Sequence, residues 1–271
     1  MAIDQFIPEI WSAGVTQSFI ANQIVIPTLN TQYSGDATRG NTVHIINATT
    51  PTIVDYKAAG RSITAEALND TEVQLLLNQE KAFSVNVDDV DKVQAAGSFN
   101  AWTDAAGKAL AEDAETYLLA QMLAGATNGN TGEVVVDTSD EAKTAIRSIR
   151  TAMVTAKVPM GNRYVVVTPD FGDLLIQGLS DVAAAGSSEE LRNGQIVRLY
   201  GMNVLESPLL GTDVSAIGYH GDTVAFVNQI QSLEALRNQT KFSDIVRGLN
   251  VYGAKVIKSE AVIKYVSYVA P

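Results

Sequence analysis

The chain has 271 residues, of which 46% are hydrophobic and 18% charged, so it can bury a sizeable core and is not disordered as a whole. Its formal net charge is −11 and no basic stripe is visible, which argues against sequence-specific nucleic-acid binding. The absence of cysteine excludes disulfides, thiolate chemistry and cysteine metal sites. We expect neither a membrane span nor a signal peptide, because no window approaches 18 apolar residues and the first residues show no basic region followed by an apolar run. We therefore expect a soluble protein made in a cytoplasm.

The first 30 residues carry many large apolar side chains with only a partial helical period. They include Phe6, Ile7, Trp11 and Phe19. The segment either packs on its own domain or forms an arm that packs partly on neighbouring chains, since so much apolar surface needs cover.

Residues 31–87 are predicted to form a long β-hairpin. A turn signal at Tyr33–Asp36 precedes a strand from Thr42 to Ile46, and alternating apolar residues mark the return from Thr71 to Val87. The stretch between the strands, residues 49–70, has little apolar content. A polar excursion of about 20 residues is unusual inside a compact domain, so we interpret it as a projecting loop that finds its partner elsewhere.

Within residues 88–125, one long amphipathic helix of about 34 residues, roughly 50 Å in length, is predicted between the aspartates at the start and Gly125 at the end. Asp88, Asp89 and Asp91 would complement the positive helix N-terminus, and Gly125 would provide the C-cap. One face of this helix is apolar or small, and it comprises Phe99, Trp102, Ala106, Leu110, Ala114, Tyr117 and Leu118.

The remainder of the chain mixes strands and helices without regular βαβ alternation, which indicates an α+β fold. A capping box at Thr138 and Glu141 starts a helix, Tyr164–Val167 is suited to a central strand, and Pro169 opens another helix. The predicted elements that follow are a loop at 183–188, a strand at 202–205, two short elements within 223–237, and strands at 250–257 and 262–269.

Catalytic chemistry finds little support in this sequence. The chain has two histidines: His44 lies inside an alternating strand, where a structural role is expected, and His220 lies in a turn without a visible partner. The aspartates at 88, 89 and 91 lack the glycine and glutamate of a calcium loop. Glycines at 194, 201 and 211 fit no phosphate-binding spacing. We expect no catalytic, cofactor-binding or metal-binding residues, and we interpret Glu112, Asp113 and Glu115 as a solvated helix face.

Taken in order, several segments resemble the major capsid proteins of tailed bacteriophages with the Hong Kong 97-type fold. They are Phe6–Ser12, Tyr33–Asp36, Gly40–Ile45, Phe83–Asp91, Glu234–Arg237, Phe242–Asp244 and Arg247–Val256. The resemblance covers nearly the whole chain, and the order and spacing of the motifs carry it.

The resemblance implies an α+β capsid fold with five parts. These would be an N-terminal arm at 1–32, an extended loop at 33–87, a peripheral domain with a long spine helix at 88–132, an axial domain at 133–240, and peripheral return strands at 241–271. The extended loop would lie across a neighbouring subunit.

The resemblance also implies a function: the chain would self-assemble as pentamers and hexamers into an icosahedral shell around the double-stranded DNA of a tailed phage. Its partners would be copies of itself, a separate scaffolding protein, a portal and a decoration protein, with no membrane and no sequence-specific contact to DNA. It would reside in the virion after assembly in the cytoplasm of a bacterial host.

Lys57 is the loop lysine placed for a covalent cross-link, which some members form, but no asparagine partner is identifiable. Two alternatives stay open, a nanocompartment shell of the same fold and an α+β enzyme or ligand-binding protein with its site at His220.

Overall fold

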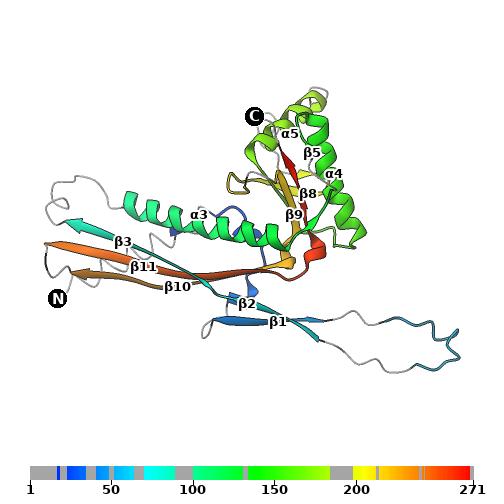
Figure 1. The fold of residues 1–271 in the computed structure, drawn as a ribbon, viewed down its shortest axis with the longest axis horizontal. Helices are drawn as coiled ribbons and strands as arrows, with labels where there is room; N and C mark the ends of the chain where they lie inside the picture. The colour runs from blue at the N-terminus through cyan, green and yellow to red at the C-terminus, as the bar shows by residue number, and fades with distance from the viewer. Residues whose placement is uncertain are drawn as a thin grey trace.

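The computed structural model is an elongated molecule in which one long helix lies along a long sheet, a second sheet stands at one end, and a hairpin projects beyond it (Figure 1). The structure describes residues 17–18, 23–34, 41–48, 52–63, 70–88, 100–130, 134–183, 198–211, 214–237, 240 and 242–268.

The long sheet contains three antiparallel strands in the order β10-β11-β3. These are β3 (Gln79–Asp88), β10 (Val224–Arg237) and β11 (Ser243–Val256). The two short elements that we predicted within 223–237 are therefore one strand of 14 residues, whose register shifts between Ile230 and Ser232. The irregularity interrupts the alternation of side chains there, which explains why the sequence pattern looked like two elements.

The hairpin is confirmed for its first two strands only. β1 (Thr42–Ala48) pairs antiparallel with β2 (Asp70–Leu76), but β3 pairs with β11. The predicted hairpin at 33–87 thus included a strand that belongs to the long sheet. Alternation of side chains identifies strands but does not say which partner each strand takes, because both β2 and β3 bury one face.

The long helix is confirmed from Asn100 to its predicted end at Gly125. α3 spans Asn100–Gly125, which is 26 residues, and Asp88 ends β3 opposite Ser243 instead of opening the helix. Residues 89–99, which include Asp89, Asp91 and Phe99, lie outside the described residues, as does the side chain of Trp102. The predicted apolar face is confirmed further along, where Ala114 and Leu118 are fully buried and Leu110 and Tyr117 pack against the same core.

The second sheet has six strands in the order β4-β12-β9-β6-β8-β7. Their bounds are Thr127–Asn128 for β4, Arg163–Val167 for β6, Arg198–Leu199 for β7, Met202–Glu206 for β8, Ala216–His220 for β9 and Val262–Tyr265 for β12. As predicted, β6 is a central, buried strand. A separate parallel pair joins β5 (Val134–Val135) to β13 (Ser267–Tyr268).

Two helices cover one face of the six-stranded sheet. α4 (Ser139–Thr155) begins with the predicted capping box, in which Thr138 accepts from the backbone of Glu141 and Glu141 accepts from the backbone of Thr138. The pKa of Glu141 is lowered by hydrogen bonds from the backbone of Asp137 and from Thr138. α5 (Pro169–Ala183) starts at the predicted proline. Short 3₁₀ turns connect other elements at Ile26–Thr28, Gln32–Ser34, Gly221–Thr223 and Ser259–Ala261.

The sheet pairings cut across two predicted segment boundaries. β10 falls inside the segment 133–240 that we assigned to the axial domain, yet it pairs with β11 along its whole length. β12 falls inside the predicted peripheral return at 241–271, yet it pairs with β9 in the six-stranded sheet. Both boundaries came from the resemblance and divided the chain into consecutive segments, whereas each sheet combines strands that are far apart in the sequence.

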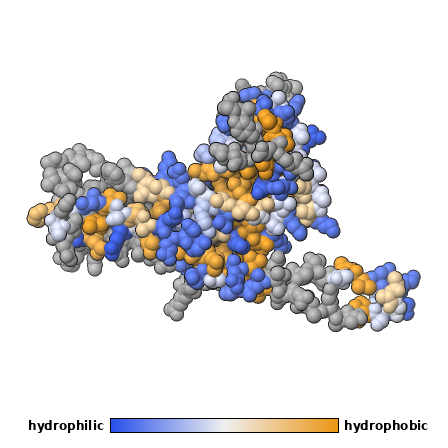
Figure 2. Space-filling view, in the orientation of Figure 1, coloured by the Kyte–Doolittle hydropathy of each residue, from blue (hydrophilic) through white to orange (hydrophobic). Residues whose placement is uncertain are grey.

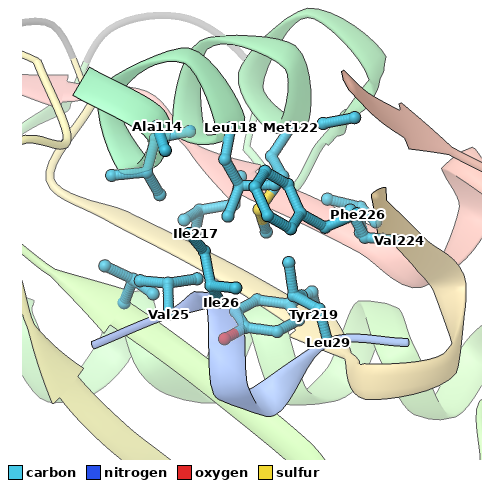
Figure 3. Packing of buried hydrophobic residues seen from close by; sticks show 14 of the residues in the cluster. Val25, Ile26, Leu29, Ala114, Leu118, Met122, Ile217, Tyr219, Val224 and Phe226 are labelled. Carbon is cyan, nitrogen blue, oxygen red and sulfur yellow. The ribbon is translucent and has the colours of Figure 1, made fainter. Parts of the chain in front are cut away.

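One hydrophobic core joins the two sheets through α3 (Figure 3). The helix contributes Leu118 and Met122, the long sheet contributes Phe226, and the six-stranded sheet contributes Ile217 and Tyr219. The N-terminal segment closes this core from the other side with Val25, Ile26 and Leu29. Because both sheets bury side chains against the same helix, α3 fixes their relative orientation.

Candidate assembly surfaces

The hairpin is seated on the long sheet by a small apolar cluster. Val43 and Ile45 of β1 and Leu75 of β2 are at most 6% exposed and contact Ala225 and Val227 of β10. Period-two alternation puts these side chains on one face of the hairpin, which therefore packs on the sheet.

The packing of the hairpin on the long sheet also brings two backbone segments close together. A Cβ added to Gly253 of β11 would lie 2.3 Å from the carbonyl oxygen of Leu76. Only glycine leaves room for this approach, so the position of the hairpin depends on the absence of a side chain at residue 253.

The outer face of the hairpin carries exposed apolar and charged side chains together. Ile46 is 71% and Leu76 50% exposed, and the imidazole Nδ1 of His44 contacts the carboxylate of Glu72 on the same face. His44 thus has the structural position that we predicted, pairing with the neighbouring strand at the surface.

Beyond β1 and β2 the chain forms a self-contained turn. The Asp55 carboxylate accepts hydrogen bonds from the backbone of Lys57 at 3.0 Å and Ala58 at 3.2 Å. The Asp55 carbonyl accepts from Ala59 at 2.9 Å, and the backbone of Arg61 donates to Tyr56 at 2.8 Å. The tip of the projection is therefore organised by its own hydrogen bonds, without support from the two sheets.

Exposed apolar side chains lie among hydrophilic ones on this tip (Figure 2). Ile53 is 95% exposed, Ile63 63%, Tyr56 52% and Val54 50%. We described residues 49–70 as polar and missed these four. Their signal was the presence of four large apolar residues within a segment already expected to project from the core, where burial by the same chain cannot explain them.

Glu115 on α3 contradicts the prediction of a solvated helix face. Its side chain is 2% exposed, and its Oε1 accepts hydrogen bonds from the backbone of Ile24 at 2.5 Å and Val25 at 2.7 Å. Asp113 is also engaged, since it accepts from the Tyr252 hydroxyl and lies 3.4 Å from the Lys81 ammonium. Glu112 is exposed as predicted. Glu115 therefore holds the N-terminal segment to the helix, and Asp113 holds the long sheet to it.

His220 lies where a structural role accounts for it. Its side chain is 6% exposed at the end of β9, and its Nδ1 accepts from the backbone of Asp222 at 3.3 Å, which caps a 3₁₀ turn. Its cross-strand neighbour Arg163 is also buried, and its guanidinium donates to the carbonyls of Val158 and Pro159. No hydroxyl nucleophile is hydrogen-bonded to the His220 ring among the described contacts, so the geometry offers no triad.

The other chemical candidates are dispersed. Asp88 lies in β3, and the described residues contain no group of three or more potential metal ligands. Lys57 is exposed on the projecting turn. None of the described helices is long and apolar enough to cross a membrane.

Comparisons with known proteins agree with this architecture. The family model of the phage capsid protein matches residues 50–265. A solved structure from Mycobacterium phage Che8 is 37% identical, with a TM-score of 0.79 and coverage of 90% of each chain. The capsid structure of the Cyanophage P-SCSP1u has a TM-score of 0.71 at 14% identity, covering 86% of this chain and 85% of that one. A virus-like particle from Pyrococcus furiosus has a TM-score of 0.61 at 12% identity, covering 97% of this chain and all of that one. A comparison with curated proteins gave no match.

The family match over residues 50–265 and the similarity to the Che8 structure indicate a structural protein of a shell. The chain belongs to the phage capsid protein family. Its fold is the Hong Kong 97-type capsid fold that the sequence motifs suggested.

Proposed function

We propose that this chain self-assembles as pentamers and hexamers into an icosahedral shell that encloses the double-stranded DNA of a tailed bacteriophage. The observation that carries the proposal is the projecting hairpin, whose tip exposes Ile53, Tyr56 and Ile63 without any core of its own. Exposed apolar side chains gathered in this way mark a surface that another chain covers.

The tip is suited to binding because it is already organised. The hydrogen bonds around Asp55 hold the turn in shape before any partner arrives. A preformed turn loses less conformational entropy on binding than a disordered loop, so more of the burial energy of its apolar side chains contributes to assembly.

The observed pairings suggest revised parts for the proposed subunit. The extended loop is β1, β2 and the turn between them, seated on β10 and β11. The peripheral part is α3 with β3, β10 and β11, and the axial part is the six-stranded sheet with α4 and α5. The axial part meets its copies around five-fold and six-fold axes, and the loop of each subunit lies on a neighbour.

The proposed contents of the shell follow from charge. A formal net charge of −11 favours a wall that contains DNA without binding it tightly. A separate scaffolding protein and a portal would assist assembly in a bacterial cytoplasm, a decoration protein would bind outside, and no catalytic activity is needed.

The second candidate is a nanocompartment shell that encloses protein, which the similarity to a virus-like particle from Pyrococcus furiosus favours. The contents of purified particles distinguish the two. Particles from phage-producing cells should contain nuclease-protected DNA of one length, and a uniform protein cargo with no protected DNA would contradict the proposal in favour of the alternative.

A further inference from the structure

The six-stranded sheet has two edges on opposite flanks of the axial part. Its strand order puts β4 at one end and β7 at the other. In a ring of identical subunits each copy presents one flank to the copy before it and the other flank to the copy after it, so the two surfaces in contact are different. If the axial parts form rings, as the proposed function requires, a contact through the sheet edges joins the β4 flank of one copy to the β7 flank of the next.

The β4 flank is hollowed. An open groove of about 910 Å³ runs between β4 and α4, lined by Thr127 and Asn128 on the strand side, Arg147, Thr151 and Thr155 on the helix side, and Glu260 at one end. The hydroxyls of Thr151 and Thr155 donate to backbone carbonyls one turn back in the helix. Their oxygen lone pairs therefore remain able to accept hydrogen bonds from a partner.

The β7 flank carries a tight turn. β7 and β8 are joined by Tyr200 and Gly201, whose φ angles of +49° and +85° are typical of a two-residue hairpin turn. Tyr200 is 41% exposed, and Arg198 beside it is also exposed. A tyrosine on a rigid turn is a favourable anchor, because it offers apolar area and a hydroxyl donor at low entropic cost.

The two flanks match in height along the strands. Tyr164 of β6 pairs with Asn203 of β8 and with Tyr219 of β9, and Tyr219 in turn pairs with Val262 of β12. The start of β8, which follows the β7–β8 turn, therefore lies at the same end of the sheet as the start of β12, which follows Glu260. Rotation about a ring axis changes neither the distance of a residue from the axis nor its height along the axis. The turn of one copy therefore meets the Glu260 end of the groove in the next.

The charges on the two flanks are complementary at two heights. Arg198, next to the turn, carries the charge opposite to Glu260. Glu206, at the other end of β8, lies about 13 Å along the strand from Met202, which follows the turn. Arg147 lies a similar distance, about 12 Å, along α4 from Thr155. Glu206 and Arg147 are therefore at similar heights on their two flanks. Both Glu206 and Arg147 are exposed. One rotation thus pairs opposite charges twice.

We propose that the β7–β8 turn of one subunit docks into the α4–β4 groove of a second copy of this chain. Tyr200 lies against Thr151 and Thr155, Arg198 faces Glu260, and Glu206 faces Arg147. The inference rests on the proposed function, because it specifies which surfaces join neighbouring axial parts.

The test uses the fact that the chain contains no cysteine. The double variant Thr155→Cys with Tyr200→Cys should form disulfides only between copies. Within one chain α4, which carries Thr155, packs over β12 and β9, and β9 is two strand spacings, about 10 Å, from β8 at the β7–β8 turn, whereas a disulfide requires Cα atoms within about 7 Å. Oxidised particles should run on a denaturing gel without reductant as a ladder that ends at the ring size, and reductant should return them to monomers.

A matched control uses the opposite flank of the same helix. Arg150 is exposed on α4 but does not line the groove, so Arg150→Cys with Tyr200→Cys should give no ladder. A second test reverses one charge with Glu260→Arg or Arg198→Glu, which should lower the particle yield at least tenfold, and the double charge variant should recover it.

The outcomes separate this proposal from the proposed function. Closed particles of the Thr155→Cys, Tyr200→Cys variant that give no disulfide ladder would overturn the docking proposal alone, and so would a charge swap without recovery. Failure of the unmodified chain to form particles would instead contradict the proposed function, and the docking proposal with it.

Discussion

The Oε1 atom of Glu115, in the middle of the long helix, lies 2.7 Å from the backbone nitrogen of Val25, 90 residues earlier in the chain. Both groups are buried, and the same oxygen also accepts from Ile24 at 2.5 Å. A carboxylate therefore satisfies backbone donors that the turn at Ile26–Thr28 would otherwise leave unpaired inside the core. This contact attaches the N-terminal segment to the spine of the subunit.

Replacing Glu115 with alanine should destabilise the subunit strongly. The substitution leaves buried N–H groups without an acceptor, which costs about 1–3 kcal/mol for each group. Urea unfolding should show this loss as a lower midpoint with an unchanged slope. The control is Glu112→Ala, one turn earlier on the exposed side of α3, which should change stability by less than about 0.5 kcal/mol. Equal effects from the two substitutions would refute the anchoring role of Glu115.

The glycine beneath the hairpin should tolerate no side chain. Gly253→Ala forces a methyl group into the space next to the Leu76 carbonyl, and overpacking of this kind costs about 1–3 kcal/mol. Because the hairpin must shift to relieve the contact, we also expect a lower yield of particles. Gly161→Ala is the control, since nothing lies within 4 Å of a Cβ at that position. A Gly253→Ala variant as stable and as assembly-competent as Gly161→Ala would show that the hairpin is not held by this approach.

The exposed apolar tip should matter for assembly and not for folding. Ile53→Asp changes a side chain that is 95% exposed, so the thermal midpoint of the unassembled subunit should stay within about 2 °C of the wild type. The yield of particles by sedimentation should fall at least tenfold, because a charge would be buried without a partner at the contact. Met160→Asp, at another exposed apolar residue, controls for surface charge. Normal assembly of the Ile53 variant would exclude the tip from the interface.

The helix cap at Glu141 predicts a pH dependence. Hydrogen bonds from the backbone of Asp137 and from Thr138 lower the pKa of Glu141 in the folded state. The carboxylate therefore contributes stability above its unfolded pKa, and this contribution is lost as the pH falls through the lowered folded pKa. Comparing the thermal midpoints of wild type and Glu141→Gln from pH 7 to pH 3 checks this. The difference between them should shrink on acidification, and a constant difference would contradict the assignment.

Local chemistry allowed several elements to be predicted residue by residue. The capping box at Thr138 and Glu141, the proline start of α5 and the apolar run in β6 each have a cause within a few residues. They form in the structure where the sequence placed them, since the physical reasons for them do not depend on the remainder of the chain.

Long-range pairing was less predictable. Alternation in β3 identified a strand but not its partner β11, more than 150 residues later, and the acidic run after Val87 resembled a helix start although Asp88 still pairs with Ser243. The burial of Glu115 was also hidden, because a charged residue on a helix is usually solvated and its backbone partners lie far away in sequence. The assembly surface was recognisable as a projection, but its apolar tip became evident only when each exposed side chain could be identified.

Negative-stain electron microscopy of the purified chain, expressed with a scaffolding partner, shows whether copies of this subunit close into a shell. We predict closed, hollow particles of uniform diameter built from rings of five and six subunits. Finding only monomers or irregular aggregates under these conditions would contradict the proposed self-assembly.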